Sequence, residues 1–136
     1  MTSPNPQNIA GQPVDGYEPE AAERWPEQFA ESQRRLARLT REQQAELADV
    51  ENSITQRASM LMQSGEVADS TAMQSLVAEH YRWVCAYWTP TQDAYIGLGD
   101  MYVSDERFKA RYERVATGLA EYLRDAMRQF AFANLA

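Results

Sequence analysis

Cysteine and histidine are almost missing from this sequence, with one of each at Cys85 and His80. One cysteine cannot form an internal disulfide, and one histidine with one cysteine falls short of the four ligands of a structural zinc site. No apolar run approaches the ~20 residues that cross a bilayer. The N-terminus also lacks the charged start and apolar stretch of a signal peptide. We therefore expect a cytoplasmic protein with no disulfide, no metal and no cofactor.

Positive charge is scarce as well. The chain has 13 basic and 20 acidic residues, a net charge of −7, and its arginines are scattered among glutamates. Without a basic stripe, neither a nucleic-acid backbone nor an acidic membrane surface is an expected partner. Phosphate-binding loops and nucleophile elbows are absent too, so we expect no catalytic residues and no enzyme.

The length of 136 residues, 44% of them hydrophobic, suits one globular domain. Residues 1–16 contain several prolines and glycines and no aromatic residue, which predicts a disordered tail. From Tyr17 onward the apolar residues recur at helical spacing, and no segment alternates with a period of two. The fold class expected for residues 17–136 is therefore all-α.

Capping residues divide residues 17–136 into helices. Thr40 and Gln43 form a capping box, Gly65 is a C-terminal stop, and Ser70 is an N-cap. Thr89-Pro90 predicts a cap followed by a first-turn proline. The expected helices run over about 17–25, 26–39, 41–64, 71–88 and 90–102, then a short one after Ser104 or Asp105, and finally about 117–133. The long third helix should bury Leu47, Val50, Ile54, Ala58 and Leu61.

Aromatic residues are distributed unevenly over these helices. Only Tyr17, Trp25 and Phe29 precede residue 70, and all the others follow it. Large aromatic side chains dominate core packing. We therefore expect a firm C-terminal half and a mobile N-terminal half that acts as a helical lid.

The segment Tyr95-Ile-Gly-Leu-Gly-Asp-Met-Tyr-Val-Ser-Asp-Glu-Arg-Phe108 places two glycines inside an apolar, aromatic helix. Each glycine costs about 0.5–1 kcal/mol relative to alanine there, so something must compensate. For Gly99 the favoured explanation is contact with a neighbouring helix, whereas Gly97 could lie against a ligand.

This segment, together with Tyr-Glu-Pro-Glu-Ala-Ala-Glu-Arg-Trp at 17–25 and Gly-Leu-Ala-Glu-Tyr-Leu-Arg-Asp-Ala-Met at 118–127, resembles the TipA-S-like antibiotic-recognition domain of MerR-type regulators. The resemblance implies a globin-like helical fold whose N-terminal helices close over a bound antibiotic. Those regulators carry a DNA-binding module upstream, and we expect this chain to be a stand-alone form. Thiopeptide-binding members capture the drug through a cysteine at the position that Gly97 occupies in this chain. Because Cys85 lies outside the Tyr95–Phe108 segment, noncovalent binding is expected here.

The ligand implied by the resemblance is a large heterocyclic or aromatic antibiotic, such as a thiopeptide or an albicidin-like oligoamide. Aromatic walls with polar tips suit such ligands. His80 could be a core histidine or a pocket donor, and Asp100 could lie on a solvated face or in the pocket. The expected ligand-binding residues are Trp25, Phe29, His80, Trp83, Tyr87, Trp88, Tyr95, Gly97, Leu98, Asp100, Met101 and Tyr102.

The expected activity is drug sequestration or sensing by a monomer or weak homodimer. Two alternatives remain at this point. The same groove could bind a helix of a partner protein. Alternatively, an enzyme that degrades the drug could be centred on His80.

Overall fold

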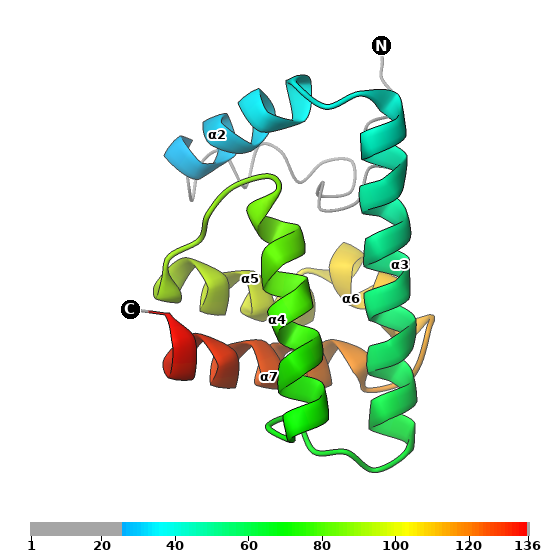
Figure 1. Cartoon of the computed structure of the whole chain (residues 1–136). Coiled ribbons are helices and arrows are strands. Elements are labelled where there is room, and N and C mark those ends of the chain that lie inside the picture. The colour runs from blue at the N-terminus through cyan, green and yellow to red at the C-terminus, as the bar shows by residue number, and fades with distance from the viewer. Residues whose placement is uncertain (1–25, 136) are drawn as a thin grey trace. The chain divides into compact units, whose positions relative to one another are not determined.

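The computed structural model describes residues 26–135, and within them every regular element is an α-helix (Figure 1). The predictions for the tail, for the helix over 17–25 and for Trp25 lie outside the described residues. The helices are α2 (Pro26–Ala37), α3 (Arg41–Gln63), α4 (Thr71–Cys85), α5 (Gln92–Ser104), α6 (Glu106–Glu113) and α7 (Leu119–Asn134). The all-α prediction is confirmed. None of these helices is long and apolar enough to cross a membrane.

The chain divides into two compact units. Of the described residues, unit 1 contains 26–52 together with Arg82–Thr89, and unit 2 contains Ser53–Tyr81 together with 90–135. The long helices α3 and α4 therefore contribute residues to both units.

The ends of α3 follow the local sequence signals. The Thr40 hydroxyl accepts from the Gln43 amide at 3.0 Å, and the Gln43 side chain accepts from the Thr40 amide at 2.9 Å, so the capping box is confirmed. At the other end Gly65 has φ +91°, and the amides of Gly65 and Glu66 donate to the carbonyls of Met62 and Leu61. This pairing is a Schellman motif, which satisfies carbonyls that the helix end leaves free.

The link between α4 and α5 differs from the prediction. Helix α4 begins after its predicted cap, with the Ser70 hydroxyl accepting from the Met73 amide, but it ends at Cys85 rather than near Trp88. Residues 86–88 form a tight turn in which the Tyr87 amide donates to the Val84 carbonyl at 2.9 Å. Thr91, not Thr89, caps α5 and accepts from the Ala94 amide at 3.2 Å.

Unit 2 contains the packed C-terminal helices, in which α5 lies along α7 (Figure 1). Gly99 permits this approach, because a Cβ added there would lie 3.4 Å from the Arg124 Cα and 3.5 Å from the Met127 sulfur. The helix-contact explanation of Gly99 is confirmed. At the other end of the pair, the Gln92 side chain donates to the carbonyls of Ala131 and Leu135.

Helix α7 begins without a side-chain cap of its own. Its N-cap residue is Gly118 at φ +90°, a conformation that favours glycine. The Glu113 carboxylate, at the end of α6, accepts from the amides of Gly118 at 2.8 Å and Ala120 at 3.1 Å. These two bonds hold the pKa of Glu113 below its usual range. A carboxylate from the preceding helix thus satisfies the positive end of α7.

One predicted member of the buried face of α3 is wrong. Val50 is 41% exposed, whereas Glu51 is only 4% exposed. The spacing 47, 51, 54, 58 follows the buried side of α3, which places the glutamate inward and the valine outward. The buried Glu51 lies near the candidate site, where its charge acts on Tyr87.

Candidate ligand-binding site

His80, Tyr95 and Tyr102 come together in the interior of unit 2. The Tyr95 hydroxyl lies 2.7 Å from His80 Nδ1, and the Tyr102 hydroxyl lies 3.2 Å from His80 Nε2. All three side chains are at most 4% exposed. A neutral imidazole donates through one nitrogen and accepts through the other, so it can serve both hydroxyls.

Burial lowers the pKa of His80 from 6.5 to about 4. Desolvation penalises the charged imidazolium, and no opposing charge offsets it among the causes that the described residues supply. His80 is therefore neutral at pH 7, with both ring nitrogens engaged by tyrosines.

The other predicted site residues of unit 2 all lie on α5, but they differ from one another in how far they are exposed to solvent. Met101 is buried in the core, whereas Gly97 and Leu98 are half-buried. The Asp100 carboxylate accepts from Arg128 Nη2 at 3.3 Å, and both side chains are about half exposed. Asp100 therefore sits in a surface ion pair rather than in the core.

Trp83 and Tyr87 are in contact within unit 1. Their ring centroids are 5.8 Å apart in a T-shaped arrangement, and the Trp83 indole donates to the Leu47 carbonyl at 3.0 Å. Tyr87 is 1% exposed, and its hydroxyl is the one buried side-chain polar atom without a hydrogen-bond partner in the described part of the chain. Burial, followed by the negative charge of Glu51, raises the pKa of Tyr87.

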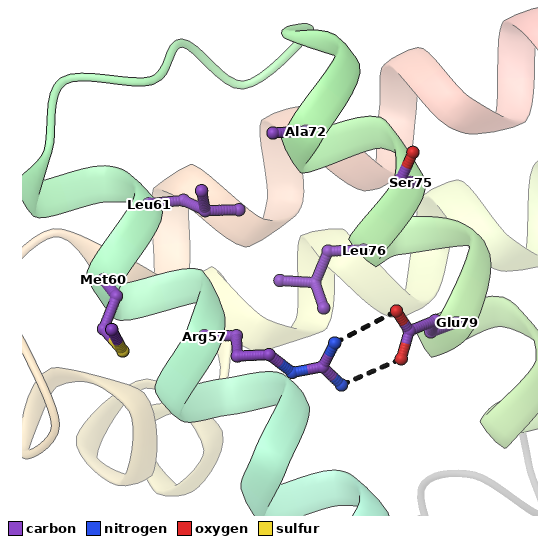
Figure 2. Close-up of a pocket in the computed structure, with 7 residues that line it drawn as sticks. All are labelled: Arg57, Met60, Leu61, Ala72, Ser75, Leu76 and Glu79. Carbon is purple, nitrogen blue, oxygen red and sulfur yellow. Dashed lines mark hydrogen bonds and ion pairs between the residues drawn. The ribbon is translucent and has the colours of Figure 1, made fainter.

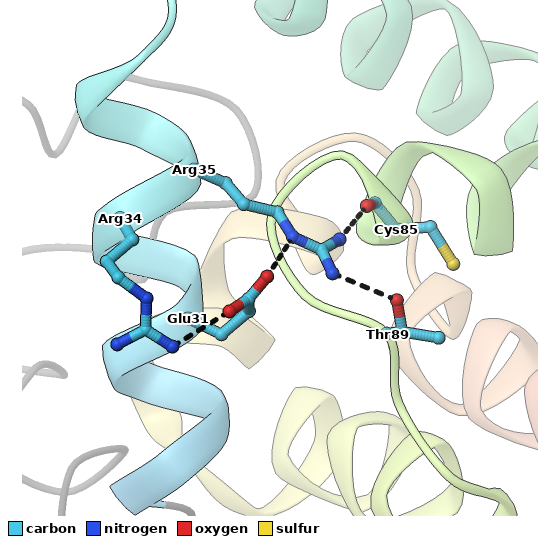
Figure 3. A network of polar contacts seen from close by, with 5 residues as sticks. All are labelled: Glu31, Arg34, Arg35, Cys85 and Thr89. Carbon is cyan, nitrogen blue, oxygen red and sulfur yellow. Dashed lines mark hydrogen bonds and ion pairs between the residues drawn. The ribbon is translucent and has the colours of Figure 1, made fainter.

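Phe29 on α2 and Trp88 are the half-buried aromatics of unit 1. A polar network connects α2 with Cys85 and Thr89, on either side of the turn that carries Trp88 (Figure 3). The Arg35 guanidinium of α2 donates to Glu31 one turn earlier, to the Cys85 carbonyl and to the Thr89 hydroxyl. The contact with Cys85 uses a carbonyl at the C-terminus of α4, where a cation is favourable. Helix α2 is thereby attached, through Arg35, to the two residues that flank the 86–88 turn.

A shallow groove of about 270 Å³ in unit 2 was not anticipated from the sequence. It runs between the second half of α3 and the first half of α4, with Leu61 facing Ala72 and Leu76 (Figure 2). A bidentate ion pair between Arg57 and Glu79, at 3.0 and 2.8 Å, borders it.

The structure thus groups the predicted residues in two sets. His80, Tyr95 and Tyr102 form a hydrogen-bonded cluster in unit 2, and Trp83 and Tyr87 form a ring contact in unit 1. The sequence interpretation missed Glu51 and Arg35. Spacing of four residues from Leu47 would have identified Glu51, whereas nothing local distinguishes Arg35 from the neighbouring arginines.

The architecture is that of an all-α domain with an aromatic interior. Comparison with known proteins identifies the family to which the domain belongs. The family model described as the TipAS antibiotic-recognition domain matches residues 17–130. The chain belongs to this family.

Similar proteins support the same assignment. The transcriptional activator TipA of Streptomyces coelicolor is 34% identical over 116 residues, which cover 83% of this chain and 46% of TipA. The regulator SkgA of Caulobacter vibrioides is 44% identical over 69 residues, covering 49% of this chain and 27% of SkgA. This chain therefore spans less than half the length of these regulators.

A solved structure matches the fold directly. TipAS of Streptomyces lividans, in complex with the thiopeptide nosiheptide, superposes with a TM-score of 0.77 and 33% sequence identity. The match covers 88% of this chain and 85% of TipAS. It confirms the globin-like helical fold that the resemblance implied.

Proposed function

We propose that this chain binds a large heterocyclic or aromatic antibiotic noncovalently and thereby sequesters the drug or signals its presence. The observation that carries the proposal is the match to TipAS, which was solved with nosiheptide and is similar over nearly the whole fold. Since the relatives are transcriptional regulators, we also propose that binding takes place in the cytoplasm.

The proposed contacts comprise two groups. In unit 1 they are the aromatic residues Phe29, Trp83, Tyr87 and Trp88, and in unit 2 they are His80 and the α5 residues Tyr95, Gly97, Leu98, Asp100, Met101 and Tyr102. Half-buried members such as Trp88 and Leu98 can contact a ligand as they stand. Fully buried members such as Tyr95 act by shaping the surface unless the unit opens.

A catalytic role of His80 finds little support in this geometry. Both nitrogens face tyrosine hydroxyls, and the side chain is 4% exposed. A general base must reach the proton it removes, directly or through one water. We therefore propose binding without chemical change to the ligand.

The test is isothermal titration calorimetry of the purified chain with nosiheptide, followed by an albicidin-like oligoamide. We expect saturable binding with Kd of about 1 μM or tighter, and a ligand mass that is unchanged after incubation. Trp88→Phe should weaken binding, with Val67→Ala, an exposed substitution in unit 2, as the matched control. Absence of binding to both drugs would contradict the proposal and favour the helical interaction module, which a pull-down would then examine.

A further inference from the structure

The hydroxyl of Tyr87 is an exception among the buried tyrosines. Tyr95 and Tyr102 are hydrogen-bonded to His80, and the partly buried Tyr122 donates to the Glu66 carbonyl at 2.7 Å. Tyr87 is only 1% exposed, yet its hydroxyl has no hydrogen-bond partner among the residues the structure describes. A buried donor without a partner is destabilising, so its presence calls for a reason outside the free fold.

We propose that the Tyr87 hydroxyl is a specificity-determining contact that donates a hydrogen bond to a neutral acceptor on the ligand, such as an amide carbonyl or an azole nitrogen. This inference rests on the proposed function and names one polar contact within it. It also predicts which ligand groups the subsite rejects.

The surroundings of the hydroxyl determine the chemistry of that acceptor. The Trp83 ring packs against the Tyr87 ring, with the two ring centroids 5.8 Å apart, and provides an apolar wall on this side. The buried carboxylate of Glu51 contributes to the raised pKa of Tyr87, so the hydroxyl keeps its proton and acts as a donor. The same negative charge repels an anionic acceptor. A neutral carbonyl or azole nitrogen satisfies the donor without that repulsion.

The contacts of α2 provide a route by which a ligand can reach this position. Tyr87 lies in the 86–88 turn, and Arg35 binds Cys85 and Thr89 on either side of it. Of the side chains described on α2, only Ser32 and Leu36 are buried. Because so little apolar surface holds α2, local opening of this helix requires little free energy. Release of Arg35 then frees the turn that carries Tyr87.

Tyr87→Phe tests the proposal because it removes one oxygen atom and keeps the ring. We expect Tm of the free variant to equal or exceed that of the wild type, since the lost hydroxyl had no partner. The Kd for nosiheptide should rise about tenfold, which corresponds to about 1.4 kcal/mol of binding free energy. Tyr122→Phe is the matched control, since its hydroxyl is bonded to Glu66. That variant should lower Tm and leave Kd unchanged.

Each other outcome has a definite meaning. If Tyr87→Phe binds nosiheptide as tightly as the wild type, the inference is overturned while the proposed function stands. A loss of affinity with a fall in Tm as large as that of Tyr122→Phe assigns the hydroxyl to the fold and also overturns the inference. If the wild type itself fails to bind nosiheptide, the proposed function fails for this drug, and the inference fails with it.

Discussion

At the scale of single residues, burial decides what His80 can do. The residue type suggests a titratable group near neutral pH, but its environment lowers the pKa from 6.5 to about 4. Between these values the unfolded chain binds a proton that the folded chain does not. The contribution of His80 therefore makes the folded state most stable above pH 6.5, and this stability is lost as the pH falls toward 4.

We predict that the free energy of unfolding falls by about 1 kcal/mol per pH unit between pH 6 and pH 4.5, measured by urea denaturation. The lowered pKa values of Glu113 and Glu31 take effect below their ordinary value of 4.5, so these two carboxylates contribute little in this window. A His80→Gln variant should flatten the curve. An equally steep curve in that variant would assign the effect to other groups.

Tyr95 illustrates the cost of removing one partner from a buried pair. Tyr95→Phe leaves a His80 nitrogen without its 2.7 Å contact inside the core. We predict a loss of about 1–3 kcal/mol in unfolding free energy, measured by urea denaturation at pH 7.5. A neutral result would show that water reaches the imidazole.

At the scale of elements, close packing explains one glycine of the α5 segment. A Cβ at Gly99 would be in ordinary van der Waals contact with Arg124 and Met127, whereas a longer side chain would meet the α7 backbone. We predict that Gly99→Ala is neutral or raises stability by up to about 1 kcal/mol, because alanine favours the helix. Gly99→Leu should lower Tm clearly. Equal Tm values for both variants would contradict the close approach of α5 and α7.

The start of α7 depends on a residue from another helix. Because Glu113 supplies the cap that Gly118 lacks, we predict that Glu113→Ala lowers unfolding free energy by about 0.5–2 kcal/mol, measured by thermal denaturation at pH 7. The difference should shrink below pH 4.5, as the wild-type carboxylate becomes protonated. Gln129→Ala, an exposed change farther along the same helix, is the control and should have little effect.

At the scale of the whole molecule, the two units differ in how they are held. Unit 2 contains most of the buried hydrophobic side chains, whereas α2 in unit 1 depends largely on the charged contacts of Arg35. We predict that hydrogen exchange is slowest in α5 and α7 and faster in α2, and that nosiheptide slows exchange in α2. Arg35→Ala should speed exchange in α2 alone. Equal protection of α2 and α7 without ligand would contradict this asymmetry.

Much of the fold was predictable because its signals are local. The Thr40–Gln43 box, Gly65 and Ser70 each act within a few residues, and all three were confirmed. The link at residues 86–91 was predicted wrongly, since Thr89 and Thr91 both offer a hydroxyl beside Pro90. Local chemistry did not distinguish them, and Pro90 itself is buried in the folded chain.

The sequence by itself determined the helical class, the acidic surface and the family, because composition, periodicity and motifs need no knowledge of distant contacts. Only the tertiary structure decided which groups meet. His80 finds Tyr95 and Tyr102 at separations of 15 and 22 residues, and Arg35 reaches Cys85 across 50. The unpaired hydroxyl of Tyr87 and the burial of Glu51 were likewise decided by the tertiary structure. Burial and pairing are properties of packed neighbours, which are set by the fold rather than by adjacent residues.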